Sequence, residues 1–454
     1  MLRCKMKSTL LISAGILCCN LAARAQQPVA AKFDTTFHTT YYDQKRSLFE
    51  LLPDTKNEII FLGNSITDIG EWAELFQNPS VKNRGISSDI TFGVIDRLPE
   101  VLSSKPAKIF YMIGINDIAK NIPDSVILAN HQRIVSIIKQ QSPTTKIYIQ
   151  SLLPTNNEFI EFKRHQNKTE HIIAVNDGLR ELAKREQVTF IDLYPKFIDE
   201  NGKLDKKYTN DGLHLKGAGY IKWVNILKEL NYCCDDTPTS ANVSVSVSSD
   251  VNRIDTSYAN SHYRQRLEFF KHLPNTKNEI VFLGNSITEM GEWQELIPNK
   301  NVVNRGISGD VTYGIYARLD EVLASKPLKL FLMDGVNDIK RGTPVQAIAD
   351  NIQRIIEKIQ KVSPKTKIYL QSTLPVNESV KSSAYVKVSN EKIQELNELQ
   401  KKLANQLNIT YIDVQHVLSD SFGQLKREYT SDGIHLVEMG YVYWVNYLKE
   451  QKYL

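Results

Sequence analysis

Short apolar runs alternate with amphipathic stretches along the first half of the chain, and the same order recurs in the second half. Runs of this length are typical of buried strands, and the first half has four, at 58–62, 108–113, 146–152 and 188–191. Helical periodicity fills the segments between and after them, at 89–102, 125–141, 169–185 and 217–230. This alternation predicts an α/β fold with a parallel sheet covered on both faces. Active sites of such sheets gather at the carboxyl ends of the strands.

The chain is a tandem duplication. The segment LPDTKNEIIFLGNSITDIGEW at 52–72 aligns with LPNTKNEIVFLGNSITEMGEW at 273–293, and only four positions differ. Ser65 and Ser286 lie 221 residues apart, and later motifs keep this offset without a gap. Each copy has roughly 200 residues, a normal size for one domain. The sequence therefore predicts domain 1 at 40–232 and domain 2 at 260–454. Between them it predicts a linker at 233–259 that is rich in Ser, Asp, Asn and Thr.

Residues 1–25 have the pattern of a secretory signal peptide: a basic start, an apolar run at 10–22 and an Ala-Arg-Ala motif that ends at Ala25. The run is too short to span a bilayer comfortably, which leaves an uncleaved membrane anchor as the alternative. A lipoprotein anchor is disfavoured because a leucine precedes Cys18. We expect cleavage after Ala25, an N-terminal extension at 26–39, and a secreted or periplasmic protein without a transmembrane segment.

Loss of the signal peptide changes the charge balance, because it removes four basic residues and no acidic ones. The formal net charge falls from +5 to +1. At this charge the mature chain has no basic surface that would attract nucleic acid, so a nucleic-acid partner is not expected. The two remaining cysteines, Cys233 and Cys234, are adjacent and bridge each other poorly, so they are interpreted as incidental, with an intermolecular disulfide as the alternative. The sequence offers no metal-ligand spacing, and no cofactor is expected.

Two motifs carry candidate nucleophilic chemistry. Gly-Asn-Ser-Ile-Thr directly follows the first strand and puts Ser65, or Ser286 in the second copy, on a strand-to-helix turn. Such a serine is also typical of a helix N-cap. A nucleophilic serine needs a base, and the base needs a partner that fixes its tautomer. An Asp-Gly-x-His motif near the end of each copy offers both, as Asp211 with His214 and Asp432 with His435.

Two further motifs offer hydrogen-bond donors for an oxyanion. Asn-Arg-Gly-Ile-Ser follows the second strand and offers a glycine N–H, whereas Gly-x-Asn-Asp follows the third and offers an asparagine amide. Fixed donors of this kind lower the barrier to acyl transfer by roughly 3–4 kcal/mol each. A turn glycine and a loop-capping asparagine are the structural alternatives. The candidate donors are Gly85 and Asn116 in the first copy and Gly306 and Asn337 in the second.

Two recurring sets of residues have both a functional and a structural interpretation. Arg84 and Arg305 precede the candidate glycines and are candidates to bind an anionic substrate, although an ion pair with Asp89 or Asp310 is favoured. Four tryptophans recur in register and either line a sugar-binding cleft or, by default, pack in the core. They are Trp72 and Trp223 in the first copy and Trp293 and Trp444 in the second.

Together the four motifs resemble the blocks of the SGNH (GDSL-type) hydrolases, which are named for their Ser, Gly, Asn and His residues. The resemblance covers nearly all of both copies. It implies two tandem flavodoxin-like three-layer α/β/α domains with parallel sheets. It also implies nucleophilic serines, histidine bases oriented by the aspartates, and an oxyanion hole formed by the serine N–H, the glycine N–H and the asparagine amide. One departure is that Asn64 and Asn285 replace the Asp of the GDSL pattern.

The function expected from this resemblance is that of a secreted serine esterase. It would hydrolyse O-acyl esters, foremost O-acetyl esters, on carbohydrates such as acetylated sialic acids or other glycans, through an acyl-enzyme in each domain and without a metal. The resemblance extends to bacterial secreted acetylesterases and lysophospholipase-like members. A lysophospholipase or short-chain acyl esterase is therefore one alternative. A glycan-binding protein with little turnover, whose two domains give avidity, is another.

Overall fold

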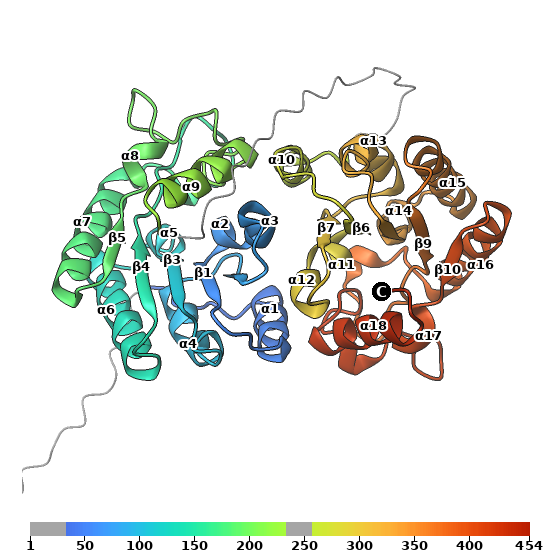
Figure 1. Cartoon of the computed structure of the whole chain (residues 1–454), viewed down its shortest axis with the longest axis horizontal. Coiled ribbons are helices and arrows are strands. Elements are labelled where there is room, and N and C mark those ends of the chain that lie inside the picture. The colour runs from blue at the N-terminus through green and yellow to red at the C-terminus, as the bar shows by residue number, and fades with distance from the viewer. Residues whose placement is uncertain (1–32, 233–256) are drawn as a thin grey trace, which may run out of the picture.

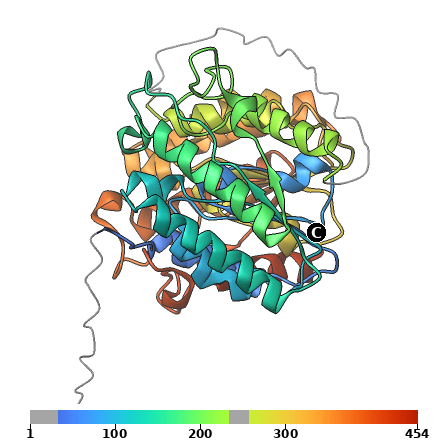
Figure 2. The same ribbon diagram turned by 90° about the vertical axis from the view of Figure 1, so that its left-hand side faces the viewer.

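The computed structural model describes residues 33–232 and 257–454. The predicted signal peptide, most of the predicted linker and the two adjacent cysteines therefore lie outside the described residues. Each copy of the repeat forms its own sheet, so the two lie side by side as two lobes (Figure 1). Turned by 90°, domain 1 lies in front of domain 2, with its green and teal helices nearest the viewer (Figure 2).

Domain 1 has a five-stranded parallel sheet with the order β2-β1-β3-β4-β5. Its strands are β1 (Ile59–Gly63), β2 (Val81–Gly85), β3 (Lys108–Met112), β4 (Lys146–Gln150) and β5 (Thr189–Ile191). Its helices are α1 (Thr40–Leu51), α2 (Ser65–Asp68), α3 (Trp72–Phe76), α4 (Thr91–Val101), α5 (Ile115–Ala119), α6 (Asp124–Gln141), η1 (Lys163–His165), α7 (Thr169–Glu186), α8 (Tyr194–Phe197) and α9 (Gly217–Glu229).

Domain 2 repeats this arrangement, with the order β7-β6-β8-β9-β10. Its strands are β6 (Ile280–Gly284), β7 (Val302–Gly306), β8 (Lys329–Met333), β9 (Lys367–Gln371) and β10 (Thr410–Ile412). Its helices are α10 (Ser261–Phe270), α11 (Ser286–Glu289), α12 (Trp293–Leu296), α13 (Thr312–Val322), α14 (Val336–Arg341), α15 (Val345–Val362), η2 (Ser383–Tyr385), α16 (Asn390–Gln406), α17 (Gln415–Leu418), η3 (Arg427–Tyr429) and α18 (Glu438–Glu450).

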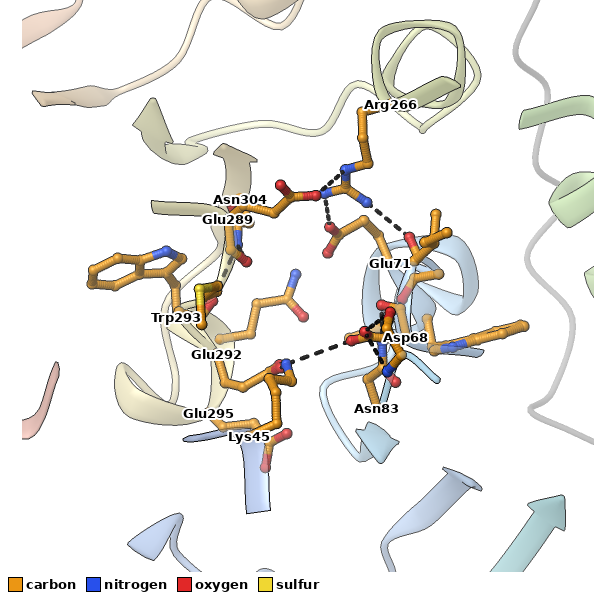
Figure 3. Close-up of a pocket in the computed structure, with 18 of the residues that line it drawn as sticks. Lys45, Asp68, Glu71, Asn83, Arg266, Glu289, Glu292, Trp293, Glu295 and Asn304 are labelled. Carbon is orange, nitrogen blue, oxygen red and sulfur yellow. Dashed lines mark hydrogen bonds and ion pairs between the residues drawn. The ribbon is translucent and has the colours of Figure 1, made fainter. Parts of the chain in front are cut away.

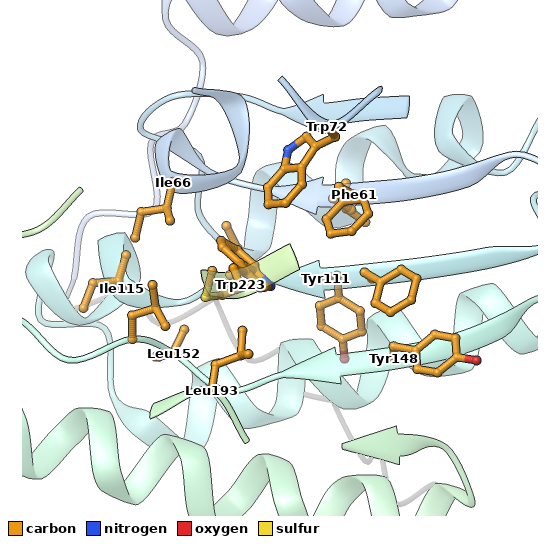
Figure 4. Close-up of a cluster of buried hydrophobic side chains, with 14 of the residues drawn as sticks. Phe61, Ile66, Trp72, Tyr111, Ile115, Tyr148, Leu152, Leu193 and Trp223 are labelled. Carbon is orange, nitrogen blue, oxygen red and sulfur yellow. The ribbon is translucent and has the colours of Figure 1, made fainter. Parts of the chain in front are cut away.

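The strands are almost wholly apolar because helices cover both faces of each sheet. In domain 1, α4, α6 and α7 pack side by side over one face, and α3 and α9 cover the other. On the second face a row of rings crosses neighbouring strands, with Trp72, Phe61 and Tyr148 labelled in Figure 4. Phe110 stacks on Phe61 at 5.1 Å and on Tyr148 at 4.4 Å between ring centroids. Trp72 stacks on Phe61 at 4.1 Å, and Trp223 meets Trp72 edge to face. All four tryptophans that recur between the copies are at most 1% exposed, so they belong to the core and not to a sugar-binding cleft.

The first helix of each copy packs across the boundary between the domains. Helix α1 packs against α18 of domain 2, and α10 packs against α9 of domain 1 (Figure 1). Accordingly, Leu48 and Phe49 of α1 are buried in the apolar cluster of domain 2, whereas Phe269 and Phe270 of α10 are buried in that of domain 1. The two copies thus exchange helices reciprocally, and each core is completed by residues from the other copy.

The predicted parallel α/β fold is confirmed, and each predicted strand and helix is found within about two residues of its expected bounds. One detail differs, because Asn83, Arg84 and Gly85 form the end of β2 and do not follow it. The exchange of α1 and α10 was not predicted. Among the described helices, none combines the length and the hydropathy of a membrane span.

Phe49→Ala tests the helix exchange. The side chain is 2% exposed and lies in the domain 2 cluster, with the Arg84 guanidinium 4.7 Å from its ring centroid. Truncation of a buried Phe leaves a cavity, so we expect a loss of about 3–5 kcal/mol in the free energy of unfolding. Urea unfolding followed by tryptophan fluorescence measures it. Phe422→Ala is the matched control, because Phe422 is 85% exposed and should change stability by no more than about 0.5 kcal/mol. Equal stability of the two variants would contradict the exchange.

Candidate active site

The candidate site of domain 1 lies at the carboxyl ends of β1, β2 and β3. Asn64 follows β1 in an extended conformation and caps α2, because its side chain accepts a hydrogen bond from the Ile66 N–H at 3.1 Å. Ser65 is therefore the first residue of α2 and not its N-cap. Asn285 caps α11 in the same way, ahead of Ser286. The asparagine that replaces the family's aspartate keeps an acceptor oxygen at the helix start.

The predicted Ser, His and Asp residues meet in domain 1. Ser65 Oγ lies 2.9 Å from His214 Nε2, and His214 Nδ1 lies 2.8 Å from Asp211 Oδ2. Since a carboxylate only accepts, this geometry assigns the proton to Nδ1 and leaves Nε2 free to accept from the serine hydroxyl. The other oxygen of Asp211 accepts the N–H groups of Leu213 and His214, at 2.9 and 2.8 Å, so the loop itself fixes the carboxylate.

Domain 2 has the same arrangement. Ser286 Oγ lies 2.9 Å from His435 Nε2, and His435 Nδ1 lies 2.6 Å from Asp432 Oδ2. Burial would raise the pKa of Asp432, but hydrogen bonds and charge attraction from His435 outweigh it and lower the pKa to about 2. The pKa of Asp211 is likewise lowered, with the same opposing contributions of burial and His214. Both aspartates are therefore ionised at neutral pH and hold the imidazoles in one orientation.

The asparagine amides lie in the short helices α5 and α14, which follow the strands next to those that precede the serines, and each has one N–H left to donate. Asn116 Nδ2 donates to the Asp89 carbonyl at 2.9 Å, and Asn337 Nδ2 donates to the Asp310 carbonyl at 3.0 Å. An amide nitrogen carries two hydrogens, so this contact orients the group without exhausting it. In domain 1 only, His165 Nε2 lies 2.9 Å from Asn116 Oδ1. Burial lowers the pKa of His165 to about 4, and the neighbouring His214 contributes in the same direction, so a neutral imidazole donates to that oxygen.

The predicted donor role of Gly85 and Gly306 is wrong. The Gly85 N–H already donates to Asn83 Oδ1 at 2.9 Å, and the Gly306 N–H donates to Asn304 Oδ1 at 2.9 Å. The glycine is needed for another reason: a Cβ at Gly85 would lie 2.1 Å from the backbone nitrogen of Asp68. The absence of a side chain therefore lets α2 lie directly against the end of β2.

A turn that the sequence analysis did not predict offers an unused N–H at the same edge of the sheet. The Asp89 N–H donates to the Ile86 carbonyl at 3.1 Å and closes a turn in which Ser88 has φ of 69°. Among the described residues, the N–H groups of Ser88 and of Ser65 donate no hydrogen bond. Both N–H groups are therefore unused, and the same turn holds the Asn116 amide through the Asp89 carbonyl. The second copy has Gly309 at this position, with φ of 81°, and this glycine is the signal in the sequence from which the turn could have been predicted. We call residues 86–89 and 307–310 the oxyanion turns.

The predicted substrate-binding role of Arg84 and Arg305 is contradicted by their positions. Arg84 is buried between the domains, where it forms a bidentate ion pair with Glu295 at 2.7 and 3.0 Å and also binds Glu100 at 3.0 Å. Its alternative partner Asp89 binds Arg97 instead, at 2.9 Å. The corresponding contacts in the second copy join Arg305 to Glu74 and Glu321, and Asp310 to Arg318.

The rims of the two sites differ. In domain 1 the Phe162 ring lies edge-on to His214 at 4.8 Å, and Ile160 beside it is 80% exposed. The side chains of His214 and Asp211 are only 9% and 4% exposed. In domain 2 the nearest ring is Tyr385, 6.5 Å from His435, and the Lys340 ammonium lies 3.9 Å from its centroid. There His435 and Asp432 are 19% and 30% exposed, so the second site is more open and has a polar rim.

Behind the serines the cores also differ. Asn285 Nδ2 donates to the buried carboxyl of Asp334 at 2.7 Å, whereas the equivalent Asn64 Nδ2 finds no partner among the described residues, because Ile113 replaces the aspartate. Burial, aided by the neighbouring Asp338 and Asp310, raises the pKa of Asp334 well above its ordinary value. This shift favours the protonated, uncharged carboxyl. The backbone carbonyl of Asp334 accepts from Thr373, which stands where domain 1 has a leucine.

A doubly wound parallel sheet with a serine, a histidine–aspartate pair and converging amide donors at its carboxyl edge defines the serine-hydrolase type of architecture. The family model described as "GDSL-like Lipase/Acylhydrolase family" matches residues 61–221 and again 282–442. The chain belongs to this family, once in each copy, and is a carboxylic-ester hydrolase. The predicted family and fold are thereby confirmed.

Known proteins with similar sequence or structure match one copy at a time. Platelet-activating factor acetylhydrolase IB subunit alpha2 from Rattus norvegicus is 28% identical over 183 residues, which are 39% of this chain and 77% of that protein. N-acylneuraminate cytidylyltransferase from Escherichia coli is 25% identical over 41% of this chain and 46% of its own length. A solved structure from Streptococcus pneumonia, provisionally described as a platelet activating factor, has 37% identity and a TM-score of 0.38, covering 42% of this chain and 88% of its own.

Asp334→Asn tests the neutral buried carboxyl. Since the folded pKa is raised above the ordinary value near 4, the folded protein keeps a proton that the unfolded chain releases at higher pH. Stability therefore falls as the pH rises from about 4 toward the folded pKa, by about 1.4 kcal/mol per pH unit. The amide keeps the acceptor for Asn285 and cannot ionise, so the variant should be more stable than the parent at pH 8 and lose this advantage toward pH 4.

Thermal unfolding of both proteins across this pH range measures the difference. Asp350→Asn, at an exposed helix position, is the control and should show no growing advantage. A difference between D334N and the parent that stays constant from pH 4 to pH 8 would rule out a neutral Asp334.

Proposed function

We propose that both domains are active and that each hydrolyses O-acyl esters through a covalent acyl-enzyme. The observation that carries the proposal is the unbroken contact from serine hydroxyl to imidazole to ionised aspartate in both copies, at distances of 2.6–2.9 Å. Ser65 and Ser286 are the proposed nucleophiles, and His214 and His435 the proposed bases.

The reaction follows from these contacts. The serine Oγ attacks the ester carbonyl carbon while its proton passes to Nε2 of the histidine. The carbonyl oxygen becomes an oxyanion, which the Asn116 amide and the N–H groups of Ser65 and Ser88 stabilise in domain 1. The tetrahedral intermediate collapses, the C–O bond to the alcohol breaks, and the alcohol leaves with the proton from Nε2. Water then gives its proton to Nε2 and attacks the acyl carbon, which releases the acid and restores the serine.

An acetyl group on a carbohydrate is the proposed substrate. The name of the rat relative, an acetylhydrolase, supports acetyl as the acyl group. The Escherichia coli relative, named for N-acylneuraminate, supports a sialic acid as the alcohol part. Lys340 beside the open second site offers a positive charge to an acidic sugar. The apolar run and Ala-Arg-Ala motif of residues 1–25 support a location outside the cytoplasm.

A lysophospholipase or short-chain acyl esterase is the second candidate. The observation that favours it is the rim of the first site, where Phe162 and Ile160 present exposed apolar surface next to His214. The third interpretation, a glycan-binding protein with little turnover, is opposed by the family membership of both copies.

Replacement of the serines tests the mechanism. Ser65→Ala and Ser286→Ala should each abolish labelling of one domain by a fluorophosphonate, read by mass spectrometry of the modified peptide. The double variant should lose at least about 10³-fold in kcat on p-nitrophenyl acetate, since loss of the nucleophile leaves only oxyanion stabilisation and binding. The matched control is Ser382→Ala, because this serine is exposed. Labelling of neither serine in the parent protein would refute the acyl-enzyme.

A substrate comparison tests the acyl and alcohol parts. Acetyl esters should be hydrolysed with kcat/KM at least about tenfold above octanoyl esters, because a short acyl pocket cannot bury the longer chain. O-acetylated sialosides and plant glycans, followed by mass spectrometry for the loss of acetyl groups, identify the alcohol. Release of fatty acid from lysophosphatidylcholine in preference to acetate would establish the second candidate instead.

A further inference from the structure

An acidic residue behind each serine holds the neighbouring oxyanion turn. In domain 1 this is Asp68, the last residue of α2. Its Oδ2 accepts the Ser87 N–H at 3.1 Å, the Ser87 hydroxyl at 2.6 Å and the Tyr41 hydroxyl at 2.8 Å. Ser87 directly precedes Ser88, whose N–H is the available donor of the turn. The carboxylate therefore fixes both the backbone and the side chain of the residue next to the oxyanion donor.

Domain 2 has the same contact with a different acid. Glu289 ends α11, and its Oε2 accepts both the N–H and the hydroxyl of Ser308. His262, at the position of Tyr41, lies 3.0 Å from the other oxygen. The recurrence with a longer side chain shows that the contact survives a change of residue type. Burial would raise the pKa of Glu289, but His262 and Arg266 outweigh it and hold the pKa well below its usual range, so the group stays charged.

Each of these acids is approached by a buried cation from the helix that opens its own copy. Lys45 of α1 is 5% exposed and lies 3.7 Å from Asp68. Arg266 of α10 is 3% exposed, lies 3.1 Å from Glu289, and donates to the Ile69 carbonyl at 2.8 Å. Lys45 and Arg266 occupy the same position in the two copies.

The second partner of each cation belongs to the opposite domain. Lys45 binds Glu292, which precedes α12 of domain 2. Arg266 binds Glu71, which precedes α3 of domain 1, at 2.6 Å. Figure 3 shows the labelled acids and cations around one cavity of about 280 Å³ between the domains. A buried charge that loses its partner is left uncompensated, so each cation depends on both of its carboxylates.

The geometry assigns two relays that cross the domain boundary. We propose that Asp68 and Glu289 are positioning residues for the oxyanion turns, and that each is held in place by a glutamate of the other domain acting through a buried cation. Relay 1 runs from Glu292 through Lys45 and Asp68 to the turn 86–89. Relay 2 runs from Glu71 through Arg266 and Glu289 to the turn 307–310. Each active site is thus complete only when the opposite domain is docked. This inference rests on the proposed function of the serines.

The relays predict effects that cross the boundary, and single-site proteins reveal them. Ser286→Ala leaves only site 1 active, and Ser65→Ala leaves only site 2. Glu292→Gln, in the full-length chain, should lower kcat of site 1 about 10- to 100-fold with KM little changed, because a displaced oxyanion donor weakens the transition state alone. The same change should leave site 2 within about twofold. Glu71→Gln should give the opposite result.

The measurement is the rate on p-nitrophenyl acetate per active site, with sites counted by fluorophosphonate titration. This normalisation removes losses that come from unfolding. Glu292→Asp, which keeps the charge, should recover part of the rate. Gln44→Ala is the matched control, because it removes an interface hydrogen bond to Ser431 (2.9 Å) that belongs to neither relay. It should leave both sites within about twofold.

Ser87→Ala gives a second, milder variant whose folding is not in question. It removes one of the two hydrogen bonds from that residue to Asp68 and should lower kcat of site 1 about fivefold, without effect on site 2. An equal effect of E292Q on both sites, an effect on KM alone, or unchanged kcat in E292Q and S87A would overturn the relays. Absence of fluorophosphonate labelling in both single-site proteins would instead overturn the proposed function, so the two failures are distinguishable.

Discussion

The close approach of α2 to the end of β2 is the constraint on which the rest of each site depends. A side chain at Gly85 would overlap the backbone of Asp68, so only glycine lets the short helix lie against the strand. That contact puts Ser65 at the end of β1 and, one helical turn later, directs Asp68 toward the turn 86–89. A single missing Cβ therefore sets the distance between the serine and the turn that faces it.

The second constraint is the burial of charge between the domains. Arg84 and Arg305 reach across the boundary to glutamates of the opposite copy, and Lys45 and Arg266 do the same nearer the sites. Ion pairs of this kind contribute little net stability when they replace apolar contacts, because desolvation offsets the attraction. They discriminate strongly against misaligned arrangements, however, since any shift leaves a charge unpartnered. The apolar contacts of α1 and α10 supply the stability, and the ion pairs fix the register.

Local patterns in the sequence predicted the sheet, its helices and the contacts that join Ser65 to His214 and His214 to Asp211, because each depends on spacing within one copy. Contacts between distant segments were beyond such reasoning. The exchange of α1 and α10 depends on which surface an amphipathic helix finds, and both copies offer the same surface. The glycine of the second block was assigned a donor role that Asn83 pre-empts, and the available N–H of Ser88 depends on a turn that only the backbone angles reveal. Arg84 was paired with the nearest acid in sequence, whereas its partner is 211 residues away.

The reciprocal exchange of the opening helices has a consequence for how the two copies can change. Loops at the rims face solvent and belong to one copy alone, which is where Phe162 and Tyr385 differ. Helices α1 and α10 are instead constrained by both copies, since each belongs to the sequence of one copy and packs in the core of the other. An excised copy would lose the helix of the other copy that completes its core. It would also take away the helix that completes the core of the other copy. The two copies therefore have to be kept together as a pair. Within the pair, the rim loops, and with them the substrate preference, can change independently, whereas the exchanged helices cannot.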